Sequence, residues 1–362
     1  MGTTRILDLR AEVRSRPTAN MWQAMHDADF GWAQRGEDPY VNQLESRGAA
    51  DTGKEACVFL ATTSLANLLS AMATTSPGEQ VVLEQDMHMV WMEGRNLAHI
   101  TSLYPRMIAS ETGEMALEEV AEALTQWRGP YPPPRTSLVA VESPHNDHGG
   151  SILSKDYLGQ LGELIHAHGG ILFMDGARLH NAAVASTTTL ADYVDAVDLV
   201  SVSLNKGIGA PYGALLCGPT EIVEEARRLQ KVVGVSGVHR VGIFASAALE
   251  ALNGWEERLA TDHGRAQALA SGIDDLSGLD VVPPQTNQVK ILTHRSGIPA
   301  ADLARALSER GVLAAVREEY YLKLFTYHEI DDEAVAHVIA AVSEAWEELS
   351  GGPRQSFELE NA

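Results

Sequence analysis

A lysine and an aspartate in this chain each follow an apolar run and each lie beside glycine. Lys206 comes after SVSLN and directly before Gly-Ile-Gly, while Asp175 ends ILFMD just before Gly176. An apolar, β-branched run followed by glycines is typical of a strand that ends in a tight turn, where a ligand can approach the backbone. The sequence therefore predicts an amine and a carboxylate at the ends of neighbouring parallel strands.

This pair of charges suits pyridoxal phosphate. A partly desolvated lysine can form a Schiff base with the cofactor's aldehyde, and a carboxylate can hold its ring nitrogen protonated. Each residue also has an ordinary alternative, because Lys206 could be a solvated lysine at a strand end and Asp175 could cap a following helix. Arg178 could neutralise Asp175 or bind a substrate carboxylate in bidentate fashion.

The segments that must position these residues alternate between strand and helix from about residue 20 to residue 250. Their apolar strands are continuous, which predicts a mostly parallel sheet covered by helices on both faces. Sites in such sheets lie at the carboxyl ends of the strands. The expected strands are 55–62, 80–85, 135–144, 171–175, 199–204 and 213–218, and the expected helices are 64–75, 117–127, 158–170 and 190–197.

The chain changes character after about Gly242, where long helical stretches precede short strands and a terminal helix. This pattern predicts a second, smaller α+β domain. Residues 131–135, YPPPR, are expected to form a loop or stiff connector. The predicted organisation is an N-terminal segment 1–19 that packs on the small domain or a partner subunit, a large domain 20–250, a small domain 251–350 and a disordered tail 351–362.

The charge balance excludes some classes of partner. With 27 basic and 49 acidic residues the net charge is −22, which argues against nucleic acid and anionic membranes. We see no signal peptide and no apolar run long enough to span a bilayer, so we expect a cytoplasmic protein. Cys57 and Cys217 lie in apolar runs and are expected to be buried, reduced thiols.

A phosphate site needs backbone N–H groups at the start of a helix. Thr63 and Ser64 stand between a strand and a helix, although hydroxyl residues there could equally serve as caps without a ligand. His88, among apolar residues, and His145, just after a strand, could each lie over a pyridine ring or act as a general base.

The His145-x-x-His148 pair beside Asp147, with Glu142 nearby, also has to be weighed as a zinc site. The loop ends in glycines rather than forming a helix, and no third ligand has an obvious spacing. We therefore expect no metal.

Taken together, these stretches resemble the L-threonine aldolase and β-eliminating lyase group of fold-type I pyridoxal phosphate enzymes. The matching stretches are EDPYVNQLES, FLATTSLANLL, QDMHMVWMEG, VESPHNDHGG, MDGARLHNAAVA and SVSLNKGIGAPYGALLCGP. They cover roughly residues 5 to 345 and occur in the family's order. The resemblance implies a fold-type I α/β fold with a smaller C-terminal domain, and a homotetramer with active sites at a dimer interface.

The resemblance also implies residue roles. Lys206 matches the Schiff-base lysine, Asp175 the pyridinium partner and Arg178 the arginine beside the cofactor and the substrate carboxylate. The other implied contacts are Thr63 and Ser64 at the phosphate, His88 on the ring, His145 toward the substrate hydroxyl, and Ser203, His239 and Arg240 among the cofactor-binding residues.

Several substrate-side positions depart from the family. Ala11, in DLRAEVRS, replaces a serine of the family's DLRSDTVT. The family's GGGMRQ loop reads GVSGVHRVG here, so His239 and Arg240 both compete for the arginine's position. The family's carboxylate-binding arginine has no clear counterpart, and Lys323 and Arg317 are the candidates. The cofactor machinery is retained while the substrate contacts are changed.

The resulting hypothesis is a threonine-aldolase-like lyase. It would cleave or form the Cα–Cβ bond of a β-hydroxy-α-amino acid, giving glycine and an aldehyde, with His145 or His88 as base and with a non-standard substrate. The alternative is another pyridoxal phosphate reaction at Cα or Cβ, such as β-elimination, aldol-type transfer or transamination. A third alternative is a non-catalytic or zinc-binding protein. It is disfavoured because Lys206 and Asp175 are both present.

Overall fold

The computed structural model describes residues 6–126, 130, 134–235, 239–274 and 276–351. The chain divides into two compact units, one formed by residues 15–261 and the other by residues 1–14 with 262–362. These boundaries fall at 14/15 and 261/262 rather than at the expected 19/20 and 250/251. Most of the expected connector 131–135 and most of the expected tail 351–362 lie outside the described residues.

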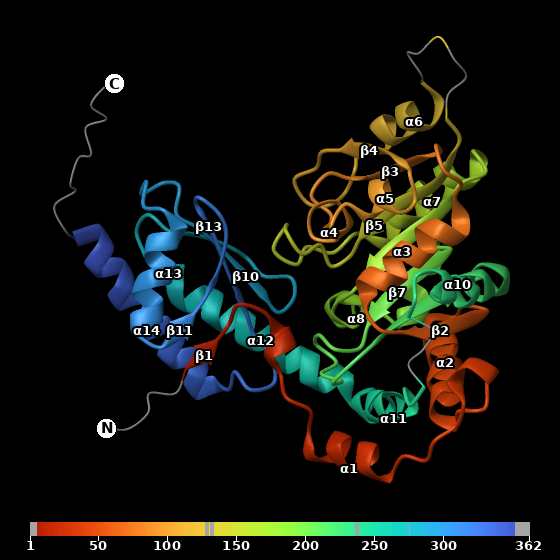
Figure 1. Ribbon diagram of the computed structural model, residues 1–362. Coiled ribbons are helices and arrows are strands. Elements are labelled where there is room, and N and C mark those ends of the chain that lie inside the picture. The colour runs from red at the N-terminus through yellow and green to blue at the C-terminus, as the bar shows by residue number, and fades with distance from the viewer. Residues whose placement is uncertain (1–5, 127–129, 131–133, 236–238, 275, 352–362) are drawn as a thin grey trace. The chain divides into compact units, whose positions relative to one another are not determined.

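The larger unit is built on a seven-stranded sheet with the strand order β2-β8-β7-β6-β5-β3-β4 (Figure 1). β8 runs antiparallel to both of its neighbours, and the remaining pairs are parallel. The strands are β2 (Ala56–Leu60), β3 (Gln80–Glu84), β4 (Tyr104–Ile108), β5 (Thr136–Glu142), β6 (Ile171–Gly176), β7 (Leu199–Ser203) and β8 (Ala214–Gly218).

Alternate residues of the central strands pack against different helices. Val139 and Met174 belong to one apolar core, while Leu138 and Phe173 belong to another on the opposite face. Both faces are therefore buried, which explains why the strand sequences are continuously apolar. The helices of this unit are α1 (Ala19–Asp27), α2 (Pro39–Thr52), α3 (Thr63–Thr74), α4 (His88–Trp91), α5 (Asn96–His99), α6 (Leu117–Thr125), α7 (Lys155–Ala167), α8 (Leu179–Ser186), α9 (Leu190–Tyr193), α10 (Thr220–Val232) and α11 (Gly242–Ala251).

The smaller unit has its own apolar core and an antiparallel sheet with the order β12-β13-β10-β9. The N-terminal β1 (Leu7–Asp8) pairs in parallel with β11 (Val312–Leu313). The other elements are β9 (Asp280–Val282), β10 (Gln288–Leu292), β12 (Ala315–Glu318), β13 (Tyr321–Phe325), α13 (Ala300–Glu309) and α14 (Asp332–Gly351). Helix α12 (Trp255–Ile273) contributes residues to both units.

The described residues contain no helix that is both long and apolar enough to cross a membrane.

Candidate active site

The carboxyl ends of β3, β5, β6 and β7 bring the polar residues of the site to one edge of the large sheet. Asp175 lies on β6 opposite Ser201 of the parallel strand β7 and opposite Glu142 of β5. Lys206 follows the end of β7 in the same unit and is partly buried. The expectation that the lysine and the aspartate come from neighbouring parallel strands is confirmed.

Two glycines shape the turn that carries Lys206. Gly209 has a φ of +80°, and its N–H donates to the carbonyl of Lys206 at 2.8 Å. A Cβ on Gly207 would come within 2.8 Å of the Leu259 side chain and 3.0 Å of Asn181 Oδ1. Gly209 therefore provides the positive φ that the turn requires. Gly207 allows the turn to pack closely against neighbouring helices, because it has no side chain.

Asp175 is 1% exposed, and its two oxygens accept different hydrogen bonds. Asn67 Nδ2 donates to Oδ2 at 2.7 Å, and the backbone N–H of Ala177 donates to Oδ1 at 3.0 Å. Both donors are neutral. A buried carboxylate held in this way is suited to meet a cationic ligand group.

Asn67 connects Asp175 to a second carboxylate. Its Nδ2 also donates to Glu93 Oε1 at 2.8 Å, and its Oδ1 accepts from Ser201 Oγ at 2.8 Å. Glu93 Oε1 in turn lies 3.0 Å from His88 Nδ1. The result is a chain of hydrogen bonds from the partly exposed His88 through Glu93 and Asn67 to the buried Asp175. Neither Asn67 nor Glu93 was among the residues proposed from the sequence.

His88 begins α4, and 29% of its side chain is exposed. Burial lowers the pKa of His88, but the hydrogen bond with Glu93 and the charges of Asp175 and Glu142 outweigh it and raise the pKa. Its backbone N–H also donates to Glu142 Oε2 at 2.7 Å. The structure therefore fixes both the ring and the backbone of His88.

Replacement of Glu93 by glutamine is expected to lower the pKa of His88, because it removes the charge that holds the imidazolium. A raised pKa stabilises the fold fully below the unfolded value of about 6.5, and this stabilisation is lost as the pH rises through the folded value. The loss of stability in Glu93→Gln should therefore be largest below about pH 6 and should shrink as the pH rises. NMR titration of the imidazole measures the shift, and Glu118→Gln on the exposed face of α6 is the control. An unchanged His88 pKa would contradict this assignment.

His145 lies deeper than the sequence suggested. It is fully buried, and its Nε2 lies 2.8 Å from Glu84 Oε2. Its Nδ1 lies 3.4 Å from the backbone N–H of His148. Both ring nitrogens are thus engaged, so contact with a substrate hydroxyl requires at least one of these bonds to open. The role of His145 as a base stays a prediction.

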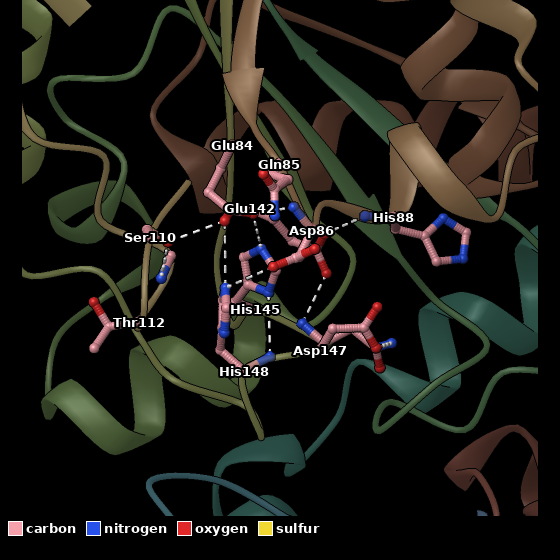
Figure 2. Close-up of polar contacts among 12 residues, drawn as sticks. Glu84, Gln85, Asp86, His88, Ser110, Thr112, Glu142, His145, Asp147 and His148 are labelled. Carbon is pink, nitrogen blue, oxygen red and sulfur yellow. Dashed lines mark hydrogen bonds and ion pairs between the residues drawn. The ribbon is translucent and has the colours of Figure 1, made fainter. Parts of the chain in front are cut away.

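Glu84 ends β3, is buried and contacts both histidines (Figure 2). Burial raises the pKa of Glu84, but hydrogen bonds from His145 and His148 outweigh it and lower the pKa to about 2. Burial lowers the pKa of His145, but the charge of Glu142 and the hydrogen bond and charge of Glu84 outweigh it, so the pKa of His145 is raised. Glu84 carried the same sequence signal as Asp175, a carboxylate ending an apolar strand, but it was not proposed.

The phosphate candidates begin helix α3. Thr62 is the N-cap, and its hydroxyl accepts from Leu65 N at 3.0 Å. Thr63 and Ser64 are therefore the first helical residues, whose N–H groups lack acceptors within the helix. Ser203 is buried, and its hydroxyl donates to Asn205 Oδ1 at 2.8 Å.

The three remaining candidates of the larger unit are one buried arginine and two exposed residues. Arg178 is buried and directly precedes α8, so Arg178 rather than Asp175 occupies the N-cap position of that helix. His239 and Arg240 are exposed, and the Arg240 guanidinium lies 5.9 Å from the Phe30 ring centroid.

Three substrate-side candidates belong to the smaller unit. Lys323 is buried on β13, and its Nζ donates to Gln288 Oε1 at 3.2 Å. Arg317 is partly exposed on β12, and Ala11 is partly exposed near the N-terminus. Their roles toward a ligand stay predictions.

This fold, a large mostly parallel sheet with an α+β unit, is that of the fold-type I pyridoxal phosphate enzymes. Leishmania major threonine aldolase is similar, with a TM-score of 0.79, 16% identity, and coverage of 94% of this chain and 99% of that chain. An aspartate aminotransferase from Rhodobacter sphaeroides has a TM-score of 0.72 at 19% identity, covering 96% of this chain and 93% of that chain.

Residues 8–296 match the beta-eliminating lyase family, and the chain belongs to this family. Among its relatives, low-specificity L-threonine aldolase 1 of Arabidopsis thaliana is 32% identical over 346 residues, which are 94% of this chain and 96% of the relative. The family resemblance identified from the sequence motifs is thereby confirmed.

Proposed function

We propose that this protein binds pyridoxal phosphate and cleaves or forms the Cα–Cβ bond of a β-hydroxy-α-amino acid. Cleavage gives glycine and an aldehyde, and bond formation joins them. The observation that carries the proposal is the buried Asp175 on β6 beside β7, whose following turn bears Lys206, in a member of the beta-eliminating lyase family. The name of the Arabidopsis relative supports this choice of reaction.

The residues present fit the cofactor. Asp175, buried and held by neutral donors, suits a protonated ring nitrogen, and Lys206 supplies an amine for the aldehyde. The N–H groups of Thr63 and Ser64 suit the phosphate, and His88 suits the face of the ring. When bound, the cofactor withdraws electrons from the bonds at the substrate's Cα.

The protein's own residues have to move the proton of the β-hydroxyl. His88 keeps part of its ring exposed, and Glu93 fixes its orientation through Nδ1. His145 is fully buried against Glu84. His88 is therefore the stronger of the two candidate bases.

Substrate orientation decides which bond at Cα breaks, so the groups that bind the carboxylate control the reaction. Arg178 offers a bidentate fork for the carboxylate, and Lys323 and Arg317 are further candidates for it, while Ala11 is a candidate for contact with the rest of the substrate. The changed substrate-side positions, among them Ala11, support a substrate other than threonine.

We further propose a homotetramer in which His239 and Arg240, both exposed, extend toward a partner's site. We expect a cytoplasmic location and no nucleic-acid or membrane partner.

The experiment is incubation of the purified, cofactor-loaded protein with a panel of β-hydroxy amino acids, followed by mass analysis of the products. We expect glycine and the matching aldehyde in equal amounts from at least one member of the panel. A 2-keto acid that has lost the β-hydroxyl, released with ammonia, would indicate β-elimination, and a 2-keto acid that keeps the β-hydroxyl, without free ammonia, would indicate transamination. No glycine from any substrate would overturn the proposed reaction while leaving cofactor binding to be judged from the visible absorbance.

A further inference from the structure

Glu84, His145 and His148 form a compact cluster at the carboxyl ends of β3 and β5. Figure 2 shows the carboxylate of Glu84 facing both imidazoles. Its Oε2 lies 2.8 Å from His145 Nε2, and its Oε1 lies 3.4 Å from His148 Nε2. The sequence offered two histidines of a possible metal site but no third ligand. The fold supplies that ligand from a strand more than 60 residues upstream.

The cluster has the composition and spacing of a three-ligand metal site. One ligand atom from each residue lies within 4.8 Å of the others. In a tetrahedral zinc site with bonds of about 2.0–2.2 Å, neighbouring ligand atoms are roughly 3.3–3.6 Å apart. The His148 contact, made to Oε1, already has this spacing, and the His145 contact, made to Oε2, has to widen by only about half an ångström.

Glu84 is also supported by donors that a metal would leave in place. Ser110 Oγ donates to Oε1 at 3.0 Å, and the backbone N–H of Asp86 donates to Oε2 at 2.7 Å. Each oxygen therefore keeps one hydrogen bond when the imidazole N–H groups are replaced by an ion. Outer-shell donors of this kind orient a metal-binding carboxylate.

The loop that carries the histidines is fixed by its backbone. His145 N–H donates to Ser151 O at 2.7 Å, and Gly150 N–H donates to His145 O at 2.9 Å. A metal on Nε2 leaves the proton of His145 on Nδ1, so the contact with the N–H of His148 has to open. That contact is 3.4 Å long, at the limit of a hydrogen bond, and opening it leaves two N–H groups that need other acceptors.

The surroundings are anionic. Glu142 is 2% exposed and, like Asp147, adds negative charge at His145. Asp86 Oδ2 lies 4.0 Å from His148 Nε2 and offers a further carboxylate beside the three ligands. A buried site with two nitrogen ligands, one carboxylate and more negative charge nearby favours a divalent ion that accepts both ligand types.

We propose that Glu84, His145 and His148 bind one divalent transition-metal ion of the zinc type, with a fourth position for water or Asp86. The ion ties the loop after β5 to the end of β3, at the same edge of the sheet as Asp175. This proposal replaces the expectation of no metal, and it does not depend on the proposed reaction.

The test is calorimetric titration of untagged, cofactor-loaded protein with Zn²⁺ after removal of bound metals. We expect one Zn²⁺ per chain, with affinity at least about 100-fold weaker in Glu84→Gln and in His148→Asn, because each loses a ligand. His166→Asn is the matched control, since His166 pairs with Asp198 at 2.9 Å in a more exposed setting. This variant should bind Zn²⁺ like the unmodified protein.

Equal affinity in the unmodified protein, Glu84→Gln and His148→Asn would overturn the proposal, as would the absence of binding to the unmodified protein. X-ray absorption of the zinc-loaded protein gives a second readout, with two imidazoles expected among the ligands. If one variant does not fold, the other decides the question. The assay measures metal rather than glycine, so its failure is distinct from a failure of the proposed reaction.

Discussion

Replacement of Lys206 by alanine is expected to lower glycine release by at least about 10³-fold, because the amine that reacts with the cofactor's aldehyde is lost. The partly buried lysine follows β7 in a turn closed by the bond from Gly209 to its carbonyl, and that backbone contact does not need the side chain. The fold should therefore persist in Lys206→Ala.

Two measurements separate chemistry from folding. Borohydride reduction followed by peptide mapping should place the cofactor on Lys206 in the unmodified protein, and no such adduct should form in the variant. Lys155→Ala, on the exposed first residue of α7, is the control and should keep both activity and adduct. A variant that still shows the cofactor's visible absorbance and full activity would exclude Lys206 as the reactive amine.

The architecture of the sheet was predictable because its strands are buried on both faces. Short apolar runs such as ILFMD and LVSVS, which alternate with amphipathic helices, are typical of buried parallel strands. The edge strand β4 was missed because most of its residues are exposed, and it contains Pro105. The antiparallel direction of β8 was also beyond prediction, since a strand has the same apolar pattern in either direction.

The same distinction applies to the site. Asp175 and Lys206 were predictable because each follows an apolar strand. Asn67 and Glu93 were not, because one lies in the first turns of α3 and the other beyond the short helix α4. Their importance comes only from contacts made across the fold. Glu84 is an intermediate case. It ends an apolar strand as Asp175 does, but its partners His145 and His148 come from a loop that is distant in the sequence.

Replacement of Asp175 by asparagine is expected to lower activity by about 10²–10³-fold, the cost of removing one preorganised electrostatic contact. The amide oxygen can accept from Asn67 or from the N–H of Ala177 but not from both, so some stability is lost and the folded fraction of the variant is checked by circular dichroism. The lost quantity is the charge that holds the ring nitrogen protonated. Steady-state kinetics should show the loss mainly in kcat.

Asp198→Asn is the matched control for this prediction. Asp198 precedes β7 at the opposite end of the strand, where its Oδ2 accepts from Leu172 N at 2.8 Å. This carboxylate also contacts β6, but it lies away from the carboxyl edge of the sheet. Asp198→Asn should keep its activity while losing some stability.

The hydrogen-bond chain from Asp175 to His88 gives the prediction a second, sharper consequence. Asp175 is among the charges that raise the pKa of His88, and Asn67 donates to both Asp175 and Glu93. Asp175→Asn should therefore also lower the pKa of His88, whereas Asp198→Asn should not. A loss of activity without a change at His88 would mean that Asp175 acts on the cofactor alone. Full activity in Asp175→Asn would contradict the role of Asp175 as the partner of the cofactor's ring nitrogen, and with it the proposed function.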